Sequence, residues 1–568
     1  MFSYMVKIEF AIKLTNDMFA YKEITNILSS SIKSIGPLFI IKICTISVTS
    51  LVAIYLGKIW YSYCFFKKRS IPGPEPEFLF GNYRQILQNK NYSETIRDWT
   101  QKYGRTYGYF EGHQPVLITS DLEIIQQVFI KQAANFNARK RPVMDKKEDD
   151  PSAHLFQSSK ARWKRMRTIM NPTFSSAKLR EFILLKYLYI KSIFYQLGPL
   201  LVNCTDRLVD CLGSVDNKEI EISPYFKRFT MDSIWNCAFG IDLNMQYEKE
   251  NEYFNKCEAV FRGSGGIGWP IYLGIFFHEY RQQILQGLIL ANRIMSKFID
   301  PKKLTPFFWL RLKVKELVEI RKKETSIKKK DYIQILLDAK ADFEEEKNFN
   351  YTEMNKKLTG IEIEANLVLF MLAGYETTST TLSYASYILA NHQDEQIKLY
   401  DEIIAHFGSD LNEINSENVL NLQYLDLFIK EVLRVYPIAN SIVARRCTSP
   451  TTIKNIKIPL DLPIAIDVMS IHFDSQLWGP VDPNIFYPKR HEIKRNPLAF
   501  LTFGIGPRNC IGMKFALKEL KIALVNLILN FEFYPGDKGD INDLKISESP
   551  IRQPVNGVKV FLKKRNLF

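Results

Sequence analysis

The stretch Phe503-Gly504-Ile505-Gly506-Pro507-Arg508-Asn509-Cys510-Ile511-Gly512 places one cysteine among three glycines and a proline, directly before a helical pattern over about residues 513–530. Glycine reaches backbone angles that other residues avoid, so this loop can fold tightly and approach a large flat surface closely. Cys510 lies where unpaired N–H groups and the helix dipole stabilise a thiolate. Arg508 carries a permanent charge that suits a carboxylate, and Phe503 can cover the sulfur and exclude water.

A thiolate in such a loop suits the axial position of a haem iron, where its electron donation favours cleavage of an O–O bond. The ten residues resemble the Phe-Gly-x-Gly-x-Arg-x-Cys-x-Gly haem-thiolate loop of the cytochrome P450 family, and every fixed position of that pattern is filled. The alternative is a glycine-rich turn that caps a helix over a buried, inert cysteine. A Cys-x-Gly pair alone would favour that alternative, whereas the whole pattern and the motifs below favour haem binding.

Length and composition allow a large folded unit. The chain has 568 residues, of which 46% are hydrophobic, and length alone would suggest roughly three or four domains. The resemblance instead implies a single cytochrome P450 fold, mainly α with a small β portion, around a buried haem and preceded by a transmembrane helix. The 8 cysteines show no metal-binding spacing, and so few in a long chain predict reduced thiols.

The charge of the chain leaves several kinds of partner open. A net charge of +15 suits an anionic membrane surface or an acidic redox partner, and it also suits a plain solvated surface rich in lysine. No RNP, zinc-finger or arginine-rich motif accompanies the charge, so we expect no nucleic-acid partner.

The N-terminal part of the chain predicts a membrane anchor and a linker. Residues 1–34 mix acidic residues with lysines and contain no arginine, unlike a mitochondrial transit peptide, and we assign them no role. Residues 35–66 are strongly apolar, and the lysines within them can reach the interface. The basic residues that begin the segment 67–76 place the rest of the chain in the cytosol. The late start of the apolar run and the absence of a small-residue cleavage site favour a single-pass anchor over a cleaved signal peptide. The segment 67–76 is proline-rich and stiff, and we expect the catalytic domain over residues 77–568.

Two segments early in this domain fit the resemblance. The strand-like runs Thr106–Phe110 and Pro115–Thr119 predict the first hairpin of a small sheet. Residues 161–170 predict a helix that ends before Asn171-Pro172 and carries Trp163 and Arg167 on one face. In the family that position contacts a haem propionate, although an aromatic–arginine pair alone is more often a surface stacking contact.

A long apolar helix is predicted from about Ile361 to Ala390, and a helix without a polar face is buried. Its middle contains Gly374, Glu376 and Thr377, and buried polar groups are costly without partners. Gly374 lets a flat ligand lie against the helix, and Thr377 can bond either a carbonyl one turn back or a ligand. The segment resembles the family's oxygen-activation motif, which implies that Thr377 holds the oxygen being activated and its water while Glu376 helps to relay protons. The alternative is a kinked core helix with satisfied threonines.

The pair Glu431 and Arg434 stands three residues apart on another predicted helix. Such pairs are common on exposed helices, but the resemblance implies that this one is buried and bonded to Arg490, with a structural role. His491 stands where the family usually has phenylalanine, and Phe473 stands where arginine is common, so both departures bear on local packing.

A further arginine is implied near two strand-like segments, Thr452–Ile458 and Leu462–Val468. Arg445 falls where related sequences place another propionate-binding arginine, and Arg446 beside it is the competing assignment.

The resemblance implies a haem-thiolate monooxygenase that inserts one oxygen atom of O2 into a lipophilic substrate such as a steroid, fatty acid, terpenoid or xenobiotic. The motifs are similar in sequence to those of the animal microsomal group that contains the 3A-type oxidases and thromboxane synthase. The implied cofactor is haem b (iron protoporphyrin IX), with NADPH acting through NADPH–cytochrome P450 reductase and with cytochrome b5 as a further redox partner. The implied location is the endoplasmic reticulum membrane, with the catalytic domain facing the cytosol.

The resemblance implies a haem site in which Cys510 is the axial iron ligand. The other implied haem-binding residues are Arg508, Trp163, Arg167, Arg445, Phe503, Gly504 and Gly374. Three alternatives remain at this point: a peroxide isomerase or dehydratase on the same fold that needs no external electrons, a haem carrier or sensor without catalysis, and a peroxide-driven enzyme.

Overall fold

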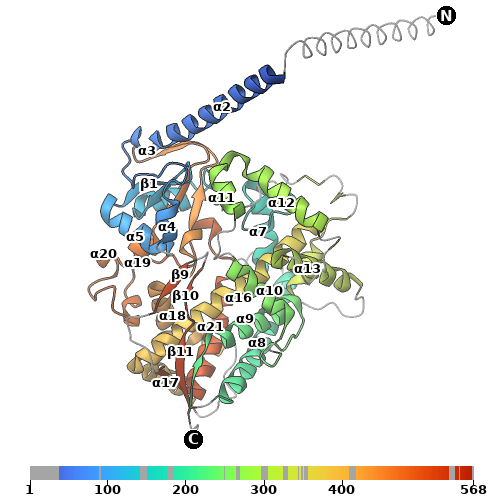
Figure 1. Ribbon diagram of the computed structural model, residues 1–568. Helices are drawn as coiled ribbons and strands as arrows, with labels where there is room; N and C mark the ends of the chain where they lie inside the picture. Colours follow the sequence, from blue (N-terminus) through green and yellow to red (C-terminus); the bar gives the residue numbers. More distant parts are fainter. Residues whose placement is uncertain are drawn as a thin grey trace, which may run out of the picture. The chain divides into compact units, whose positions relative to one another are not determined.

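The computed structural model describes residues 37–88, 91–140, 150–174, 184–215, 217–248, 250–263, 269–295, 298, 305–323, 331–342, 345–346, 349–350, 356–408, 417–536, 544–548 and 551–565 (Figure 1). The chain divides into two compact units, Met1–Phe65 and Phe66–Phe568. The extension that we expected over residues 1–34 lies outside the described residues.

The first unit contains helix α2 (Pro37–Ser62). Its segment Ile41–Ser62 is 22 residues long and apolar enough to cross a membrane, and a helix of that length spans about 33 Å against a hydrocarbon core of about 30 Å. The hydroxyls of Thr45 and Thr49 donate to backbone carbonyls one turn back, at 2.8 and 2.9 Å. These polar groups are therefore satisfied within the helix.

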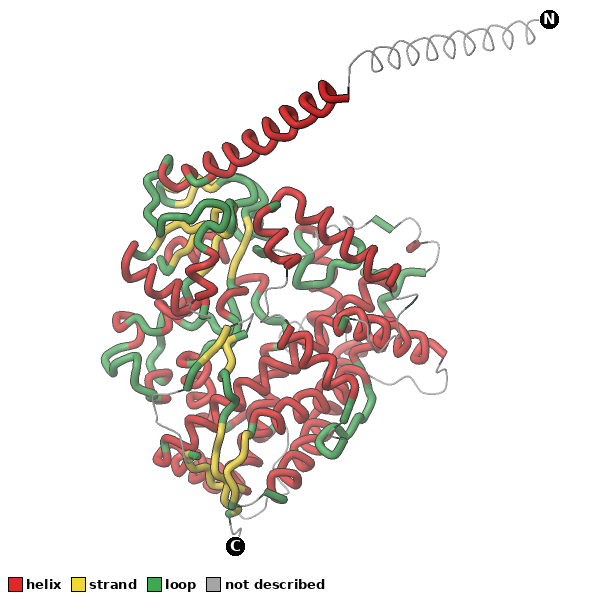
Figure 2. The backbone as a smooth tube through the Cα atoms, viewed as in Figure 1, coloured by secondary structure: helices red, strands yellow, loops and turns green. Residues whose placement is uncertain are grey.

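The second unit is mostly helical (Figure 2). The described helices after α2 are α3 (Cys64–Lys67), α4 (Tyr83–Gln88), α5 (Tyr92–Tyr103), α6 (Leu122–Gln126), α7 (Lys160–Phe174), α8 (Leu184–Gly213), α9 (Ser223–Ile234), α10 (Glu252–Gly263), α11 (Trp269–Phe276), α12 (Arg281–Met295), α13 (Pro306–Lys323), α14 (Tyr332–Asp338), α16 (Gly360–Asn391), α17 (Gln393–Phe407), α18 (Gln423–Val435), α19 (Val468–His472), α20 (Ser475–Trp478) and α21 (Met513–Asn530).

The described strands form four small sheets. One has the order β1 (Thr106–Glu111), β2 (Gln114–Thr119), β7 (Pro463–Ile466), β4 (Ala444–Arg446), with only the β2–β7 pair parallel. Another has the order β3 (Lys218–Glu221), β11 (Lys559–Lys564), β8 (Phe531–Pro535). The remaining two are the hairpins β5 (Thr451–Ile453) with β6 (Ile456–Ile458), and β9 (Ile546–Glu548) with β10 (Arg552–Pro554). The predicted first hairpin is confirmed as β1 and β2.

Helix α16 is the central element of the second unit, and α9, α18 and α21 pack against it (Figure 1). A capping box sets its first turn. The Thr359 side chain accepts from the Glu362 N–H, and the Glu362 carboxylate accepts from the Thr359 N–H, both at 3.2 Å. The predicted helix from Ile361 to Ala390 is confirmed with one additional residue at each end.

Two predicted strands near β4 are wrong in extent. Thr452–Ile458 is a hairpin rather than one strand, because Lys454 takes a left-handed φ of 49° and reverses the chain between β5 and β6. The second predicted strand ends at Ile466, because the Asp467 side chain accepts from the Ser470 N–H at 2.9 Å and starts α19.

Helix α7 also continues further than its sequence predicts. We expected an end before Asn171-Pro172, but the helix runs to Phe174. A proline in the last turn removes a single backbone hydrogen bond, so the helix passes it more readily than it would pass an interior proline. The prediction for α21, in contrast, matches the structure from Met513 to Asn530.

A buried acid lies where α21 meets α9 and α16. Glu519 is fully buried, and burial raises its pKa to about 8, while the nearby hydroxyls of Ser233 on α9 and Thr378 on α16 partly oppose that shift. Neither carboxyl oxygen has a hydrogen bond of ordinary geometry within the described residues. The folded protein therefore keeps Glu519 protonated at neutral pH.

This gives a prediction for stability. The unfolded chain loses the Glu519 proton near an ordinary pKa of 4.5 and the folded chain only at about 8, so this group costs stability as pH rises through that window, by roughly 1.4 kcal/mol per pH unit. Glu519→Gln removes the titration. The melting temperature of the variant should therefore rise relative to wild type between about pH 6 and about pH 8. Glu492→Gln at an exposed site should track wild type, and equal pH profiles for all three proteins would contradict a protonated Glu519.

Candidate functional site

Ala373 and Cys510 are two described residues with accessible side chains beside well-buried neighbours. Ala373 is exposed in the middle of α16, where Leu369 and Thr377, one turn to either side, are half-buried and most other positions are buried. Cys510 is also exposed. Ile511, the next residue, packs against the same hydrophobic cluster as Leu369. The loop before α21 and this open face of α16 therefore belong to one region.

The loop that carries Cys510 is tightly folded, as the glycines predict. Gly504 and Gly506 have left-handed φ values of 68° and 74°. A Cβ on Gly506 would lie 1.9 Å from the Phe129 carbonyl oxygen, so only glycine fits there. The Cys510 N–H donates to the Phe503 carbonyl at 2.8 Å, while the Phe503 ring packs into the core cluster shared by α16, α18 and α21.

The surroundings of the Cys510 thiol shift its pKa in both directions. Burial raises its pKa, while the N–H groups of Gly512 and Met513 and the charges of Arg167 and Arg139 lower it. The sequence predicted a stabilised thiolate, and for the free thiol that prediction is wrong, because desolvation outweighs the helix start.

Four arginines surround this loop. Arg445 and Arg508 are buried, and Arg139 and Arg167 are half-buried. Burial lowers the pKa of Arg508 well below its usual range, and repulsion from the other three arginines lowers it further. Burial likewise lowers the pKa of Arg139 to about 10. No ion pair joins any of the four to a carboxylate of the residues that the structure describes. The cluster is an uncompensated positive site.

The predicted residues of α7 lie at this cluster. Arg167 donates to the backbone and side-chain oxygens of Asn509, at 2.8 and 3.0 Å. The Arg508 guanidinium lies over the Trp163 ring, 4.9 Å from its centroid, and donates to the Ser158 carbonyl at 2.7 Å. The structure thus brings Trp163, Arg167 and Arg508 together beside the Cys510 loop, and their binding of a haem propionate stays a prediction.

Helix α7 is held in this position by its other face. Arg162 and Arg165 donate to the Glu362 carboxylate at 2.9 and 2.8 Å, and all three side chains are buried. Because Glu362 also forms the capping box of α16, this group ties the start of α16 to the helix that carries Trp163 and Arg167. Sequence reasoning missed this pairing.

Arg139 is the site residue that sequence reasoning missed. It donates to the carbonyls of Arg508 and Ile442, at 3.0 and 3.2 Å, and its guanidinium lies 4.3 Å from the Phe156 ring centroid. Its Nε has no partner among the described residues. The only signal in the sequence is a short basic run at residues 139–141, which does not distinguish a site residue from a solvated one.

The structure decides between the two arginines of β4. Arg445 lies against the Phe129 ring, 4.5 Å from its centroid, and donates to the Ile505 carbonyl at 3.4 Å. Arg446 instead forms an ion pair with Asp461. Arg445 is therefore the one that faces the Cys510 loop, as the resemblance implied.

The polar residues of α16 point in different directions. Thr377 lies on the open face, and its hydroxyl donates to the Ala373 carbonyl at 2.8 Å, as predicted. Glu376 is buried on another face, with an oxygen 3.1 Å from the Lys227 ammonium of α9. The prediction that Gly374 makes room for a flat ligand is wrong, because this glycine faces α9. A Cβ there would lie 2.3 Å from the Ile234 side chain, so this glycine allows α9 to approach α16 rather than a flat ligand.

The predicted scaffold around Glu431 is confirmed. Its carboxylate accepts from Arg434 and Arg490 at 2.8 Å, and all three side chains are buried. His491 joins this group with Nε2 2.9 Å from the carboxylate. Burial alone would raise the pKa of Glu431, but the hydrogen bonds with Arg434 and His491 outweigh it and lower this pKa to about 2.

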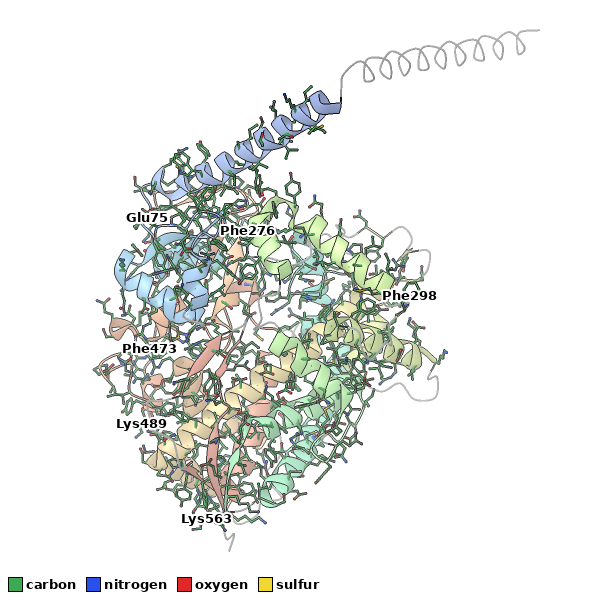
Figure 3. The ribbon with its side chains drawn as sticks, viewed as in Figure 1. Glu75, Phe276, Phe298, Phe473, Lys489 and Lys563 are labelled. Carbon is green, nitrogen blue, oxygen red and sulfur yellow. The ribbon has the colours of Figure 1, made fainter. Side chains whose placement is uncertain are left out.

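Phe473, which stands where the family commonly has arginine, also has a favourable contact in the structure. Phe473 lies beside α19 and α20 (Figure 3), and the Arg97 guanidinium stacks on its ring, 4.7 Å from the centroid. The Phe473 ring thus lies against the cationic Arg97 side chain, at a position where the family commonly has an arginine.

These observations fit a haem. The group needs an accessible sulfur ligand, which Cys510 supplies, and cations for its two carboxylates, which the uncompensated arginines supply. The open face of α16 between Leu369 and Thr377 offers a wall without large side chains, because Ala373 stands at its centre.

Comparison with known proteins decides the family. A family model described as Cytochrome P450 matches residues 71–558. The chain belongs to the cytochrome P450 family. It is 31% identical to mouse cytochrome P450 3A13 over 92% of this chain and 96% of that protein. It is 30% identical to dog cytochrome P450 3A12 over 91% of this chain and 95% of that protein. It is 31% identical to the putative cytochrome P450 CYP13A3 of Caenorhabditis elegans over 86% of this chain and 93% of that protein. The protein is a haem-dependent monooxygenase, an oxidoreductase.

We propose that Arg139 joins Arg167, Arg445 and Arg508 in holding the haem carboxylates. Arg139→Ala should then have two effects of opposite sign. The haem-free protein should gain stability, because a repulsive buried charge is removed, while haem loss to excess apomyoglobin should become on the order of tenfold faster, because a charge-assisted hydrogen bond is lost.

The exposed Arg105, which pairs with Asp474, offers the matched control. Arg105→Ala should leave the rate of haem loss unchanged. Haem loss from Arg139→Ala at the wild-type rate would remove Arg139 from the site.

Proposed function

We propose that this cytochrome P450 hydroxylates or otherwise oxygenates a lipophilic organic substrate, using O2 and electrons that NADPH supplies through a flavoprotein reductase. The observation that carries the proposal is the pairing on α16 of a hydroxyl on the open face, Thr377, with a buried acid at the preceding position, Glu376. Reductive activation of O2 consumes protons, and these two side chains can deliver them.

The proposed roles follow from position. Cys510 would be the thiolate ligand of the haem iron. The haem carboxylates would be held by four arginines, Arg139, Arg167, Arg445 and Arg508. Trp163 would fix the plane of the Arg508 guanidinium. The bound haem supplies the redox chemistry on O2. Thr377 would hold a water and a proton at its hydroxyl, and Glu376 would exchange protons with that water. Gly504 and Gly506 would serve by shaping the loop, and Glu431, Arg434 and Arg490 by rigidifying the chain behind it.

We further propose that α2 anchors the protein in the membrane of the endoplasmic reticulum, with the second unit in the cytosol. The support is the length and composition of α2 and the basic cluster Lys67–Arg69 that follows it. A membrane anchor suits a lipophilic substrate, and NADPH–cytochrome P450 reductase and cytochrome b5 are the proposed partners on that surface. Steroids, fatty acids, terpenoids and foreign compounds remain the substrate classes to screen.

The second candidate is a peroxide isomerase or dehydratase without external electrons. It needs no proton delivery, so the Glu376–Thr377 pair favours the monooxygenase. Reductase-containing vesicles with NADPH, screened with a steroid, dodecanoic acid and a monoterpene, separate the two. The monooxygenase predicts substrate-stimulated NADPH oxidation, whereas turnover of a fatty-acid hydroperoxide with no NADPH use would establish the alternative.

The central prediction concerns Thr377→Ala in the same vesicles. The variant should keep haem bound by the thiolate but yield several-fold less product per NADPH, with the difference appearing as hydrogen peroxide, because the hydroxyl that steers protons is missing. Ser383→Ala is the matched control, since its hydroxyl also donates to a carbonyl one turn back, at 2.9 Å, but in the core. Unchanged coupling in Thr377→Ala would argue against the assigned role.

A further inference from the structure

His472 lies between helix α18 and the chain that enters the Cys510 loop. It ends α19 directly before Phe473, which Figure 3 labels, and its side chain is fully buried. Its Nε2 atom accepts from the Leu501 N–H at 3.0 Å, and its Nδ1 atom lies 2.9 Å from the Arg434 carbonyl oxygen. One imidazole therefore bridges two segments that lie 29 and 38 residues away from it in the sequence.

The two partners determine which nitrogen of His472 carries the proton. A backbone N–H can only donate, so Nε2 accepts, and a carbonyl oxygen can only accept, so Nδ1 donates. Burial lowers the pKa of His472 to about 3, although its hydrogen bond with the Arg434 carbonyl partly opposes this shift. The ring is therefore neutral at physiological pH and keeps both hydrogen bonds at the same time.

The α18 side of this bridge is held by buried charges. The Arg434 guanidinium donates to the His472 carbonyl at 2.7 Å, so the two residues are joined by two hydrogen bonds. The same guanidinium donates to the Glu431 carboxylate at 2.8 Å, and all three residues are buried. His472 thus takes its position from the ion-pair network around Glu431.

The other side of the bridge leads to Cys510 over a few residues. The Leu501 carbonyl accepts from the Gly504 N–H at 2.8 Å, and the Phe503 carbonyl accepts from the Cys510 N–H, also at 2.8 Å. The residue that His472 binds therefore starts the turn in which the cysteine is held.

Two contacts beside this bond hold the same segment. The Phe500 ring stacks on the His472 ring, with centroids 5.7 Å apart and planes 7° apart. The Thr502 hydroxyl donates to the Leu433 carbonyl of α18 at 2.9 Å. Leu501 itself is fully buried. Its N–H depends on His472 as acceptor, because an unpaired N–H in the interior is costly.

We propose that His472 is a positioning residue for the haem-thiolate loop. By accepting from Leu501, it holds the chain that carries Cys510 against α18 and keeps the sulfur where it binds iron. The inference adds a residue to the site and rests on the proposed ligation of the haem iron by Cys510.

The test compares two amides that each keep one half of the imidazole. His472→Asn places an amide nitrogen near the Nδ1 position and keeps the bond to Arg434, but it has no acceptor for Leu501. His472→Gln reaches the Nε2 position and keeps that acceptor.

The first readout is the Soret band of the reduced, carbon-monoxide-bound, full-length protein in vesicles, followed over time in a fixed subdenaturing concentration of urea. His472→Asn should lose the red-shifted band on the order of tenfold faster than wild type, because a buried N–H is left without its acceptor. His472→Gln should lose the band at close to the wild-type rate.

The second readout is the iron–sulfur stretching band in the resonance Raman spectrum of the ferric protein. His472→Asn should broaden this band, because the loop samples more positions, whereas His472→Gln should not. Both readouts report the iron ligand rather than turnover.

His491→Phe is the matched control. The His491 side chain is only 7% exposed, its ring centroid lies 5.9 Å from that of Phe500, and its Nε2 atom lies 2.9 Å from the Glu431 carboxylate. Within the described residues, its imidazole has no hydrogen bond to the segment 500–510. The variant should lower the melting temperature and leave both spectroscopic readouts at their wild-type values.

Two results would overturn the proposal. One is a His472→Asn protein whose melting temperature falls as in His491→Phe while its rate of band loss and its band width stay at wild-type values. The other is rapid band loss in His472→Gln, which decides the question even where His472→Asn yields no haem-bound protein. If wild type itself shows no red-shifted Soret band, ligation by Cys510 fails first, so the two failures are distinguishable.

Discussion

The repulsion among four arginines beside one thiol is the constraint on which the active site depends. Arg139, Arg167, Arg445 and Arg508 gather around the Cys510 loop without a carboxylate from the described part of the chain. Burying like charges is unfavourable, so the arrangement is costly for the haem-free chain and becomes favourable when an anionic group binds. The fold offsets this cost with backbone carbonyls, because the arginines donate to those of Asn509, Ser158, Ile505, Arg508 and Ile442.

Helix α16 connects this electrostatic site to the rest of the second unit. Its first turn is bound to α7 through Glu362, its open middle face presents Ala373 and Thr377, and its buried faces contact α9 and α21. One helix therefore fixes the position of Arg167 beside the Cys510 loop and of the Thr377 hydroxyl together. Substitutions at Glu362 should thus act on both ends of the site.

The sequence predicts best where a local rule decides the structure. The glycine pattern before α21, the hairpin β1–β2 and the long buried helix all follow from backbone angles or periodicity within a few residues. The sequence predicts the role of a residue less well where a partner far away in the sequence determines that role. Gly374 faces Ile234 of α9 rather than a ligand, and the pKa of Cys510 responds to burial that no neighbouring residue reveals. The family resemblance supplied Arg445 and Arg490, whereas Arg139, Lys227 and Glu519 required the folded structure, because their partners lie far away in the sequence.

The most direct measurement is the carbon-monoxide difference spectrum of the dithionite-reduced, full-length protein in vesicles. Ligation of the haem iron by the Cys510 thiolate predicts a strongly red-shifted Soret band, which Cys510→Ala should abolish. A Soret band at the position of histidine-ligated haem in the wild-type protein, or no bound haem at all, would contradict the assignment of Cys510 as the iron ligand.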